Sequence, residues 1–262
     1  MSLSCDSLKN KVCVVTGATK SIGFAVAEKY AGQGAAVALI DVDPAVMESA
    51  DKLSTLGFSV KGFVQDITVR DEVLVLFEKI TGTMGDVFCL VNNAGVVDQR
   101  PFEETRDEHF DKMFRVNVYG TAWCIQGVLP GMKANKRGKI INFSSKSGKT
   151  GSALMVPYSS AKGAIISMTQ ALAYELAPYN INVNCVCPGI TDYTGVWDSV
   201  SAGYIKNLKM DKDQVVKEFS GKIPLKRLTS INDIVDYVFF LTVAGDYCTG
   251  QALNITGGRE MH

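Results

Sequence analysis

The strongest constraint in this chain is a repeated alternation of short, almost continuously apolar runs with longer segments of helical period. Such runs are typical of strands buried on both faces of a sheet, and their alternation with helices predicts parallel pairing with right-handed crossovers. The expected strands are 12–16, 36–41, 59–65, 87–92, 139–143, 182–186 and 252–255, and the expected helices are 22–33, 44–56, 70–83, 108–134, 156–179 and 231–243. We therefore predict an α/β fold: one doubly wound, Rossmann-type domain whose seven-stranded parallel sheet carries helices on both faces.

All 262 residues fit a single domain, because α/β domains commonly run to about 250 residues. One segment of this domain departs from the alternation of strands and helices. The segment from Ile190 to Lys226 is polar and aromatic, and it follows directly on a predicted strand. Ligands of open α/β sheets bind beyond the carboxyl ends of the strands. We therefore expect this segment to cover the substrate.

Charge and composition exclude several classes of function. The 27 basic residues balance the 27 acidic ones, which argues against a nucleic-acid or anionic membrane surface. His109 and His262 are the only histidines, so a His-based triad, a His-ligated zinc ion or any other metal site is not expected. Cys185 and Cys187 would share one face of a strand as buried thiols. With neither a signal peptide nor a membrane span in view, we expect a cytoplasmic protein.

A turn of small residues follows the first expected strand and reads Thr16-Gly17-Ala18-Thr19-Lys20-Ser21-Ile22-Gly23. Such a turn lets the backbone approach a pyrophosphate, and the helix that follows offers free N–H groups. Small residues after a strand are also common in ordinary tight turns. Asp41, at the end of the second strand, can accept both hydroxyls of an adenosine ribose and would repel a 2′-phosphate. No Arg or Lys stands at 41–43, so the pattern favours NAD over NADP.

Tyr158-Ser-Ser-Ala-Lys162 is the spacing that points to chemistry. On a helix, positions i and i+4 face the same way, so the phenol would lie beside an ammonium group that lowers its pKa. Pairs of this kind are also frequent on protein surfaces, and the context decides between the two interpretations. Ser145 closes the fifth strand and can reach the same sheet edge, and Asn117 lies inside a long helix, where Asn is a poor former.

Taken together, these residues resemble the short-chain dehydrogenase/reductase family over nearly the whole chain. The matching positions are Thr16-Gly17…Gly23, Asp66, Asn92-Asn93-Ala94-Gly95, Asn117, Ser145, Tyr158…Lys162 and Pro188-Gly189. The resemblance implies that Tyr158 is the general acid–base, that Ser145 orients the substrate oxygen, and that Lys162 lowers the pKa of the phenol and binds ribose. It also implies that Asn117 anchors a water that leads protons from Lys162 to solvent.

The same resemblance implies an NAD site. Its expected residues are Gly17, Thr19, Ser21, Ile22, Gly23, Asp41, Asp66, Ile67, Asn93, Tyr158, Lys162 and Thr191, with Asp66 and Ile67 at the adenine. Two departures stand out. The family usually has Gly where Ser21 stands, and Tyr193, followed by Thr194, stands where a Thr is usual.

Three segments locally resemble sorbitol-6-phosphate and related polyol dehydrogenases: Ser145–Lys149, Pro224–Arg227, and Tyr247–Gln251 with the following Thr256–Gly258. They imply a secondary alcohol on a sugar alcohol, free or phosphorylated, bound by Ser145, Ser147 and Tyr158. Further polar candidates are Ser152, Asn142 and Gln99. Lys146 and Lys149 either bind a substrate phosphate or are solvated lysines of an exposed loop.

Two other functions stay open. Apolar Met155, Val156 and Val196 would suit a steroid, an acyl thioester or a small ketone. A cofactor-binding regulatory protein is the second, although both Tyr158 and Lys162 are present.

The helices 108–134 and 156–179 look too apolar for the surface of a monomer, which together with the resemblance predicts a homotetramer. Their apolar residues are Met113, Phe114, Val118, Ala122, Trp123, Ile165, Met168, Leu172 and Leu176.

Overall fold

The seven strands in the described part of the protein form one parallel sheet. The computed structural model describes residues 7–192 and 212–261, and within them the strand order is β3-β2-β1-β4-β5-β6-β7. The strands are β1 (Val12–Thr16), β2 (Ala36–Asp41), β3 (Val60–Val64), β4 (Val87–Asn92), β5 (Gly138–Phe143), β6 (Ile181–Pro188) and β7 (Ala252–Ile255). The predicted doubly wound sheet is confirmed. The order reverses between β1 and β4, and a reversal of this kind opens a crevice at the carboxyl edge.

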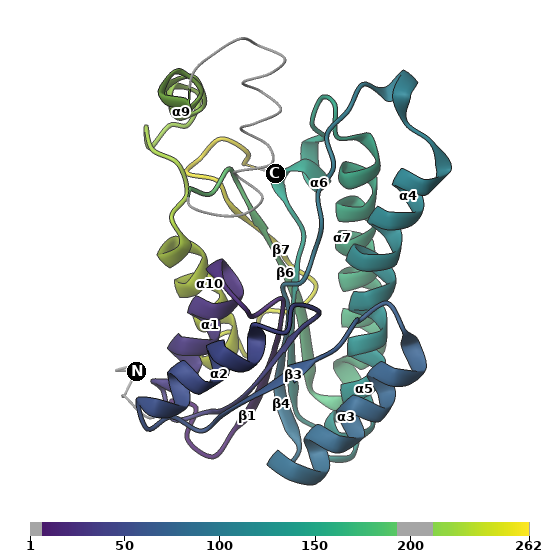
Figure 1. The fold of residues 1–262 in the computed structure, drawn as a ribbon, viewed down its shortest axis with the longest axis vertical. Helices are drawn as coiled ribbons and strands as arrows, with labels where there is room; N and C mark the ends of the chain where they lie inside the picture. The colour runs from purple at the N-terminus through teal and green to yellow at the C-terminus, as the bar shows by residue number, and fades with distance from the viewer. Residues whose placement is uncertain (1–6, 193–211, 262) are drawn as a thin grey trace.

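Helices cover both faces of the sheet (Figure 1). One layer holds α1 (Ser21–Ala31), α2 (Val46–Thr55) and α10 (Ile231–Val243), and the other holds α3 (Arg70–Met84), α5 (Thr121–Ala134) and α7 (Val156–Leu176). A short 3-10 turn, Ala177–Tyr179, ends the predicted helix 156–179. At the carboxyl edge lie two further helices that the periodicity did not predict, α6 (Lys146–Thr150) and α9 (Lys212–Gly221). None of the helices in the described part of the chain is long and apolar enough to cross a membrane.

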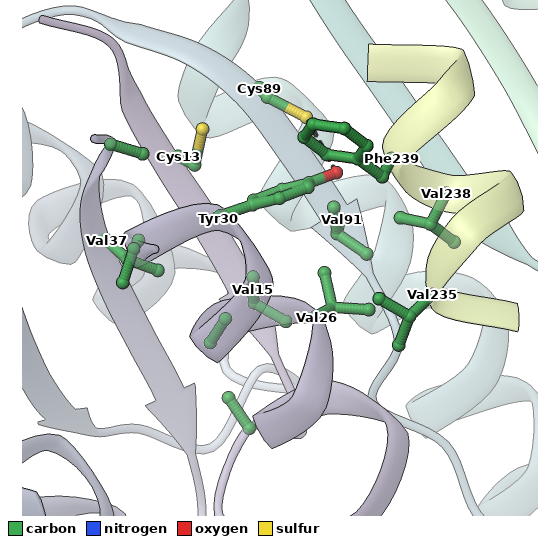
Figure 2. Close-up of a cluster of buried hydrophobic side chains, with 14 of the residues drawn as sticks. Cys13, Val15, Val26, Tyr30, Val37, Cys89, Val91, Val235, Val238 and Phe239 are labelled. Atoms are coloured by element: carbon green, nitrogen blue, oxygen red, sulfur yellow. Dashed lines mark hydrogen bonds between the residues drawn. The ribbon is translucent and has the colours of Figure 1, made fainter. Parts of the chain in front are cut away.

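Tyr30 joins α1 to α10 inside the first layer (Figure 2). Its ring is fully buried near Cys89 of β4 and Phe239 of α10, and its hydroxyl is hydrogen-bonded to the hydroxyl of Thr242. A buried phenol that lacked this partner would cost about 1–3 kcal/mol of stability. The bond therefore fixes the position of α1, whose N-terminus opens onto the carboxyl edge.

The predicted helix over 108–134 is helical without a break, but it is not an α-helix throughout. The segment consists of α4 (Asp107–Phe114), a π-helical turn over Arg115–Gly120 and then α5. A π turn holds one more residue than an α turn and commonly marks a functional position. Asn117 lies inside this turn. The periodicity of the apolar residues alone does not reveal the extra residue.

Strand ends and surface residues bring three smaller corrections. β5 ends at Phe143, so Ser145 does not close the strand but lies beyond it as the N-cap of α6. Met113, Val118, Ile165 and Leu176 are buried within the chain itself, which leaves the expected subunit contact to the half-buried Phe114, Ala122, Trp123, Met168 and Leu172. Tyr193, Thr194 and Val196 lie outside the described residues.

Candidate functional site

A trough runs along the carboxyl edge of β1, β2 and β4. Its lining includes eight of the predicted cofactor residues: Gly17, Thr19, Ser21, Ile22, Asp41, Asp66, Ile67 and Asn93. Gly23 is instead buried beneath the turn, where a Cβ would collide with the carbonyl oxygen of Gly17. Gly17 itself has φ +65°, and a Cβ there would lie 2.7 Å from the Cα of Ala94. The turn and the loop after β4 therefore pack backbone against backbone.

The side chain of Asn93 holds these two loops together. Its amide nitrogen donates to the carbonyl oxygens of Thr16, at 3.1 Å, and Gly17, at 2.9 Å. The backbone N–H of Ala94 donates to the hydroxyl of Thr16 at 3.1 Å. Asn93 thus shapes the trough as well as lining it.

Two hydroxyl groups in the turn suit a phosphate-bearing ligand. Thr19 Oγ1 and Ser21 Oγ are buried and have no hydrogen-bond partner within the described part of the protein. Buried polar groups are normally hydrogen-bonded. Ser21 also takes φ +57°, the left-handed conformation that the usual Gly would adopt, at a cost of about 1–2 kcal/mol. The turn keeps the expected backbone path, and it fits a dinucleotide.

Asp41, the last residue of β2, lines the same trough directly beside the turn. Its two carboxylate oxygens each accept one backbone N–H, from Thr19 at 3.0 Å and from Asp43 at 3.2 Å. Two carboxylate oxygens offer about four acceptor positions, so both can still accept a ribose hydroxyl. Lys20 also lines the trough and is exposed. The preference for NAD predicted from positions 41–43 does not include this basic side chain, which comes from the turn after β1.

A second pocket adjoins the trough and shares Ile22, Asn93, Gly95 and Val96 with it. It brings together Ser145, Ser147, Tyr158, Lys162, Asn117 and Thr191, all of them predicted site residues. The oxygen of Ser145 accepts the backbone N–H of Ser147 at 3.1 Å, which caps α6. The hydroxyls of Ser147 and Ser152 are 2.8 Å apart and also line the pocket.

Lys162 is buried at the base of this pocket. Its Nζ donates to the carbonyl oxygen of Phe143 at 2.7 Å and lies 5.8 Å from the centre of the Tyr158 ring. Burial lowers the pKa of Lys162 from its ordinary value of 10.5 to about 8. Within the described residues the ammonium is therefore held by a strand-end carbonyl and not by a carboxylate.

Burial raises the pKa of the Tyr158 phenol above its usual range, and a hydrogen bond with Ser145 acts in the opposite direction. The expected lowering by Lys162 does not dominate in the protein alone. A cation placed next to the ring would add to the effect of Ser145 and lower this pKa.

Asn117 fastens the π-helical turn to the loop after β4. Its Oδ1 accepts the N–H of Val96 at 3.2 Å, and its Nδ2 donates to the carbonyl oxygens of Val96 and Met113, both at 3.0 Å. A Cβ on Gly95 would lie 2.6 Å from Asn117 Oδ1 and 3.4 Å from Lys162 Nζ. The side chain therefore positions this loop directly against the buried ammonium.

Some polar candidates lie elsewhere. The amide of Asn142 is buried in the sheet, bonded to Asn92 and Thr169, because its side chain points into the helix layer and away from the edge. Gln99 and Lys149 do not line the pocket, nor does Val156, although Met155 does. Arg259, beyond β7, does line it and was missed, because nothing in the sequence links the C-terminal segment to α6.

Replacing Lys162 by Met should make the protein more stable. At neutral pH the lowered pKa corresponds to a cost of about 3 kcal/mol, and losing the bond to Phe143 O offsets about 1 kcal/mol, which leaves a gain of about 2 kcal/mol for Lys162→Met. Between pH 8 and 10.5 the unfolded wild-type chain binds more protons, so its stability rises and the difference shrinks. Urea unfolding at pH 7 and pH 10 measures both effects, and a less stable variant at pH 7 would contradict them.

Comparison with known proteins places this geometry in a family. The family model described as short chain dehydrogenase matches residues 11–204. Galactitol 2-dehydrogenase of Agrobacterium fabrum is 32% identical over 256 residues, covering 97% of this chain and 99% of that protein. The crystal structure of NAD+-bound xylitol dehydrogenase has a TM-score of 0.90 at 31% identity and covers 96% of this chain and 99% of its own.

Sorbitol-6-phosphate 2-dehydrogenase from Erwinia amylovora has a TM-score of 0.91 at 31% identity, covering 95% of this chain and all of its own, 100%. These similarities extend over nearly the full length of each protein. The chain therefore belongs to the short-chain dehydrogenase family of oxidoreductases.

Proposed function

We propose that the protein oxidises a secondary alcohol of a sugar alcohol, or reduces the matching ketose, with NAD(H) as cofactor. The observation that carries the proposal is the meeting of Tyr158, Ser145 and Lys162 in one pocket beside the hydroxyls of Ser147 and Ser152. Hydroxyl groups of this kind suit a polyhydroxylated substrate. The names of the relatives, which act on galactitol, xylitol and sorbitol 6-phosphate, support the same class.

The residues of the trough would hold the cofactor. The turn from Gly17 to Gly23, with its two orphaned hydroxyls, would receive the pyrophosphate. Asp41 would bind the adenosine ribose, Asp66 and Ile67 the adenine, and Asn93, Lys162 and Thr191 the nicotinamide end. When bound, NAD+ supplies the acceptor for the hydride that leaves the carbinol carbon.

The chain's own residues would move the proton. Tyr158, as phenolate, takes the proton of the substrate hydroxyl, and Ser145 donates a hydrogen bond to the same oxygen. The ammonium of Lys162 favours the phenolate electrostatically. Asn117 holds the loop that keeps Gly95 against this ammonium, and the resemblance assigns it a water path as well.

Three further expectations belong to the same proposal. The segment from 190 to 226 would cover the substrate, and Ile190, Thr191 and Phe219 from its described parts line the pocket. The half-buried apolar residues on α4, α5 and α7 would bury themselves between subunits of a homotetramer. A cytoplasmic location agrees with the six free cysteines of the described residues.

Tyr158→Phe should abolish most turnover while folding and NAD binding survive, because only a hydroxyl is removed. We expect kcat to fall by about 10² or more. Because alcohol oxidation requires the phenolate and burial raises its pKa, the wild-type oxidation rate should rise with pH above neutrality. Steady-state kinetics at several pH values measure the turnover of both proteins and its pH dependence, and fluorescence measures NAD binding. A variant that keeps more than a tenth of wild-type kcat would refute the role of Tyr158.

Asp41→Ala should weaken NAD binding and admit NADP, since the repelling carboxylate is gone and Lys20 in the same trough can meet a 2′-phosphate. Asp43→Ala is the matched control. Asp43 also lines the trough but accepts only a local N–H, from Ala45 at 3.0 Å, so the cofactor ratio should not change. The measurement is kcat/KM with each cofactor. A tenfold preference of the wild type for NADP, about 1.4 kcal/mol, would contradict the reading of Asp41.

A panel of alcohols with NAD, read by the absorbance of reduced nicotinamide, tests the substrate class. Galactitol, xylitol and sorbitol should be oxidised. Apolar Val96, Phe143, Met155 and Ile190 also line the pocket, so the panel includes hydrophobic ketones and acyl thioesters with NADH. Activity on those compounds alone would overturn the polyol class. NAD binding without any turnover would favour a regulatory protein.

A further inference from the structure

Two basic side chains enter the pocket that holds Tyr158, and they come from segments far apart in the sequence. Lys146 begins α6, and Arg259 lies just beyond β7, in a segment that the ion pair between Lys146 and Glu260 joins to α6. Their side chains are 16% and 23% exposed. Solvated surface lysines and arginines are far more exposed than this, so the two cations belong to the pocket wall.

These cations share one carboxylate. Glu260 Oε1 lies 3.8 Å from Lys146 Nζ and 3.4 Å from Arg259 Nε, and the side chain of Glu260 is 8% exposed. No other ion pair joins Lys146 or Arg259 to a carboxylate of residues 7–192 or 212–261. Two positive charges against one negative charge leave the group with a net charge of +1.

The two cations also repel each other. The pKa of Lys146 lies below its ordinary value, first because the side chain is buried and then because Arg259 is positively charged. Arg259 rests over the ring of Phe219, 5.7 Å from its centre, so its guanidinium is fixed on one side by an apolar wall. Partly desolvated charges that are incompletely paired are costly. A second anion in the pocket would relieve this cost.

We propose that Lys146 and Arg259 form a subsite for an anionic group of the substrate, a phosphate or a carboxylate attached to the polyol chain. The inference rests on the proposed function for the reacting alcohol, but the subsite itself depends only on the cation pair. The guanidinium offers a planar pair of donors that matches either anion, and the ammonium adds a point charge. The hydroxyls of Ser147 and Ser152 lie in the same pocket for the remaining oxygens.

Lys149 provides the matched control. It belongs to the same short helix as Lys146 and carries the same charge, but it does not line the pocket. From the sequence, both lysines were either phosphate ligands or solvated lysines of an exposed loop. In the structure Lys146 lines the pocket together with Arg259, and Lys149 does not. Replacing Lys149 removes an equal charge from the same helix without touching the subsite.

Kinetics with three ketoses test the proposal: neutral D-fructose, D-fructose 6-phosphate and the sugar acid 5-keto-D-gluconate. Arg259→Gln and Lys146→Gln should each raise KM for an anionic substrate at least tenfold, about 1.4 kcal/mol, with kcat little changed, the pattern of lost uniform binding. KM for fructose should change less than twofold, and Lys149→Gln should alter none of the three KM values. The anionic ketose whose KM rises, the phosphate ester or the carboxylate, identifies the group that the subsite binds. Equal changes for neutral and anionic substrates, or no change, would overturn the subsite.

Two more variants separate charge from structure. Arg259→Lys keeps the charge and should retain part of the affinity that Arg259→Gln loses. Glu260→Gln removes the competing carboxylate and should lower KM for the anionic substrate. If Glu260 only holds the C-terminal segment in place, Glu260→Gln would instead raise KM for all three substrates, and that result would count against the proposal.

Calorimetric titration of the NADH-loaded enzyme with inorganic phosphate and with acetate keeps the two proposals distinguishable. Binding of phosphate or acetate that is lost in Arg259→Gln supports the subsite, even if no ketose is reduced. In that case the proposed function is wrong and the subsite stands. Reduction of fructose without any anion binding and without any effect of Lys146→Gln overturns the subsite and leaves the proposed function standing.

Discussion

The arrangement of the pocket depends on the hydrogen bond between Lys162 Nζ and the carbonyl oxygen of Phe143, at 2.7 Å. This bond attaches α7 to the last residue of β5. The backbone carbonyl of Lys162 accepts the hydroxyl of Ser144 at 2.7 Å, so the same residue is tied to the strand exit twice. Gly148 packs against this carbonyl so closely that a Cβ would lie 2.7 Å from it. The helix that carries Tyr158 therefore has little freedom to slide along the sheet.

Positioning of this kind opposes stability at several places in the site. The ammonium of Lys162 is buried, the backbone of Ser21 is left-handed, and two hydroxyls of the turn lack partners in the described chain. Each feature costs free energy in the protein alone, and each faces the trough or the pocket. Local conflicts that cluster in this way are typical of functional sites. The rest of the fold, with its fully buried strands and the bonded phenol of Tyr30, compensates for them.

Much of this structure could be predicted from the sequence, since strands and helices are encoded in local apolar periods. All seven strands were placed to within a few residues, and α10 was placed to the residue. Site residues came from a pattern spread over the whole chain, and the structure gathers them along one edge. The π turn was missed because one additional residue barely disturbs the apolar period. The approach of Arg259 to Lys146 was missed because it depends on where the chain passes after β7, which no local pattern records.

The π turn over Arg115–Gly120 also sets a constraint on chain length. A π turn takes up one extra residue by winding more loosely than an α turn, so losing one residue here would restore a regular α-helix and leave α4 and α5 in nearly the same mutual orientation. Met113, fully buried on α4, would then stay in the core. The loss would fall on the turn itself, because Asn117 bonds both Val96 and Met113 from its place inside the turn and the side chains there would change direction. Loops elsewhere in this fold can drift in length among homologous chains, but this segment has to keep its residue count to keep its site.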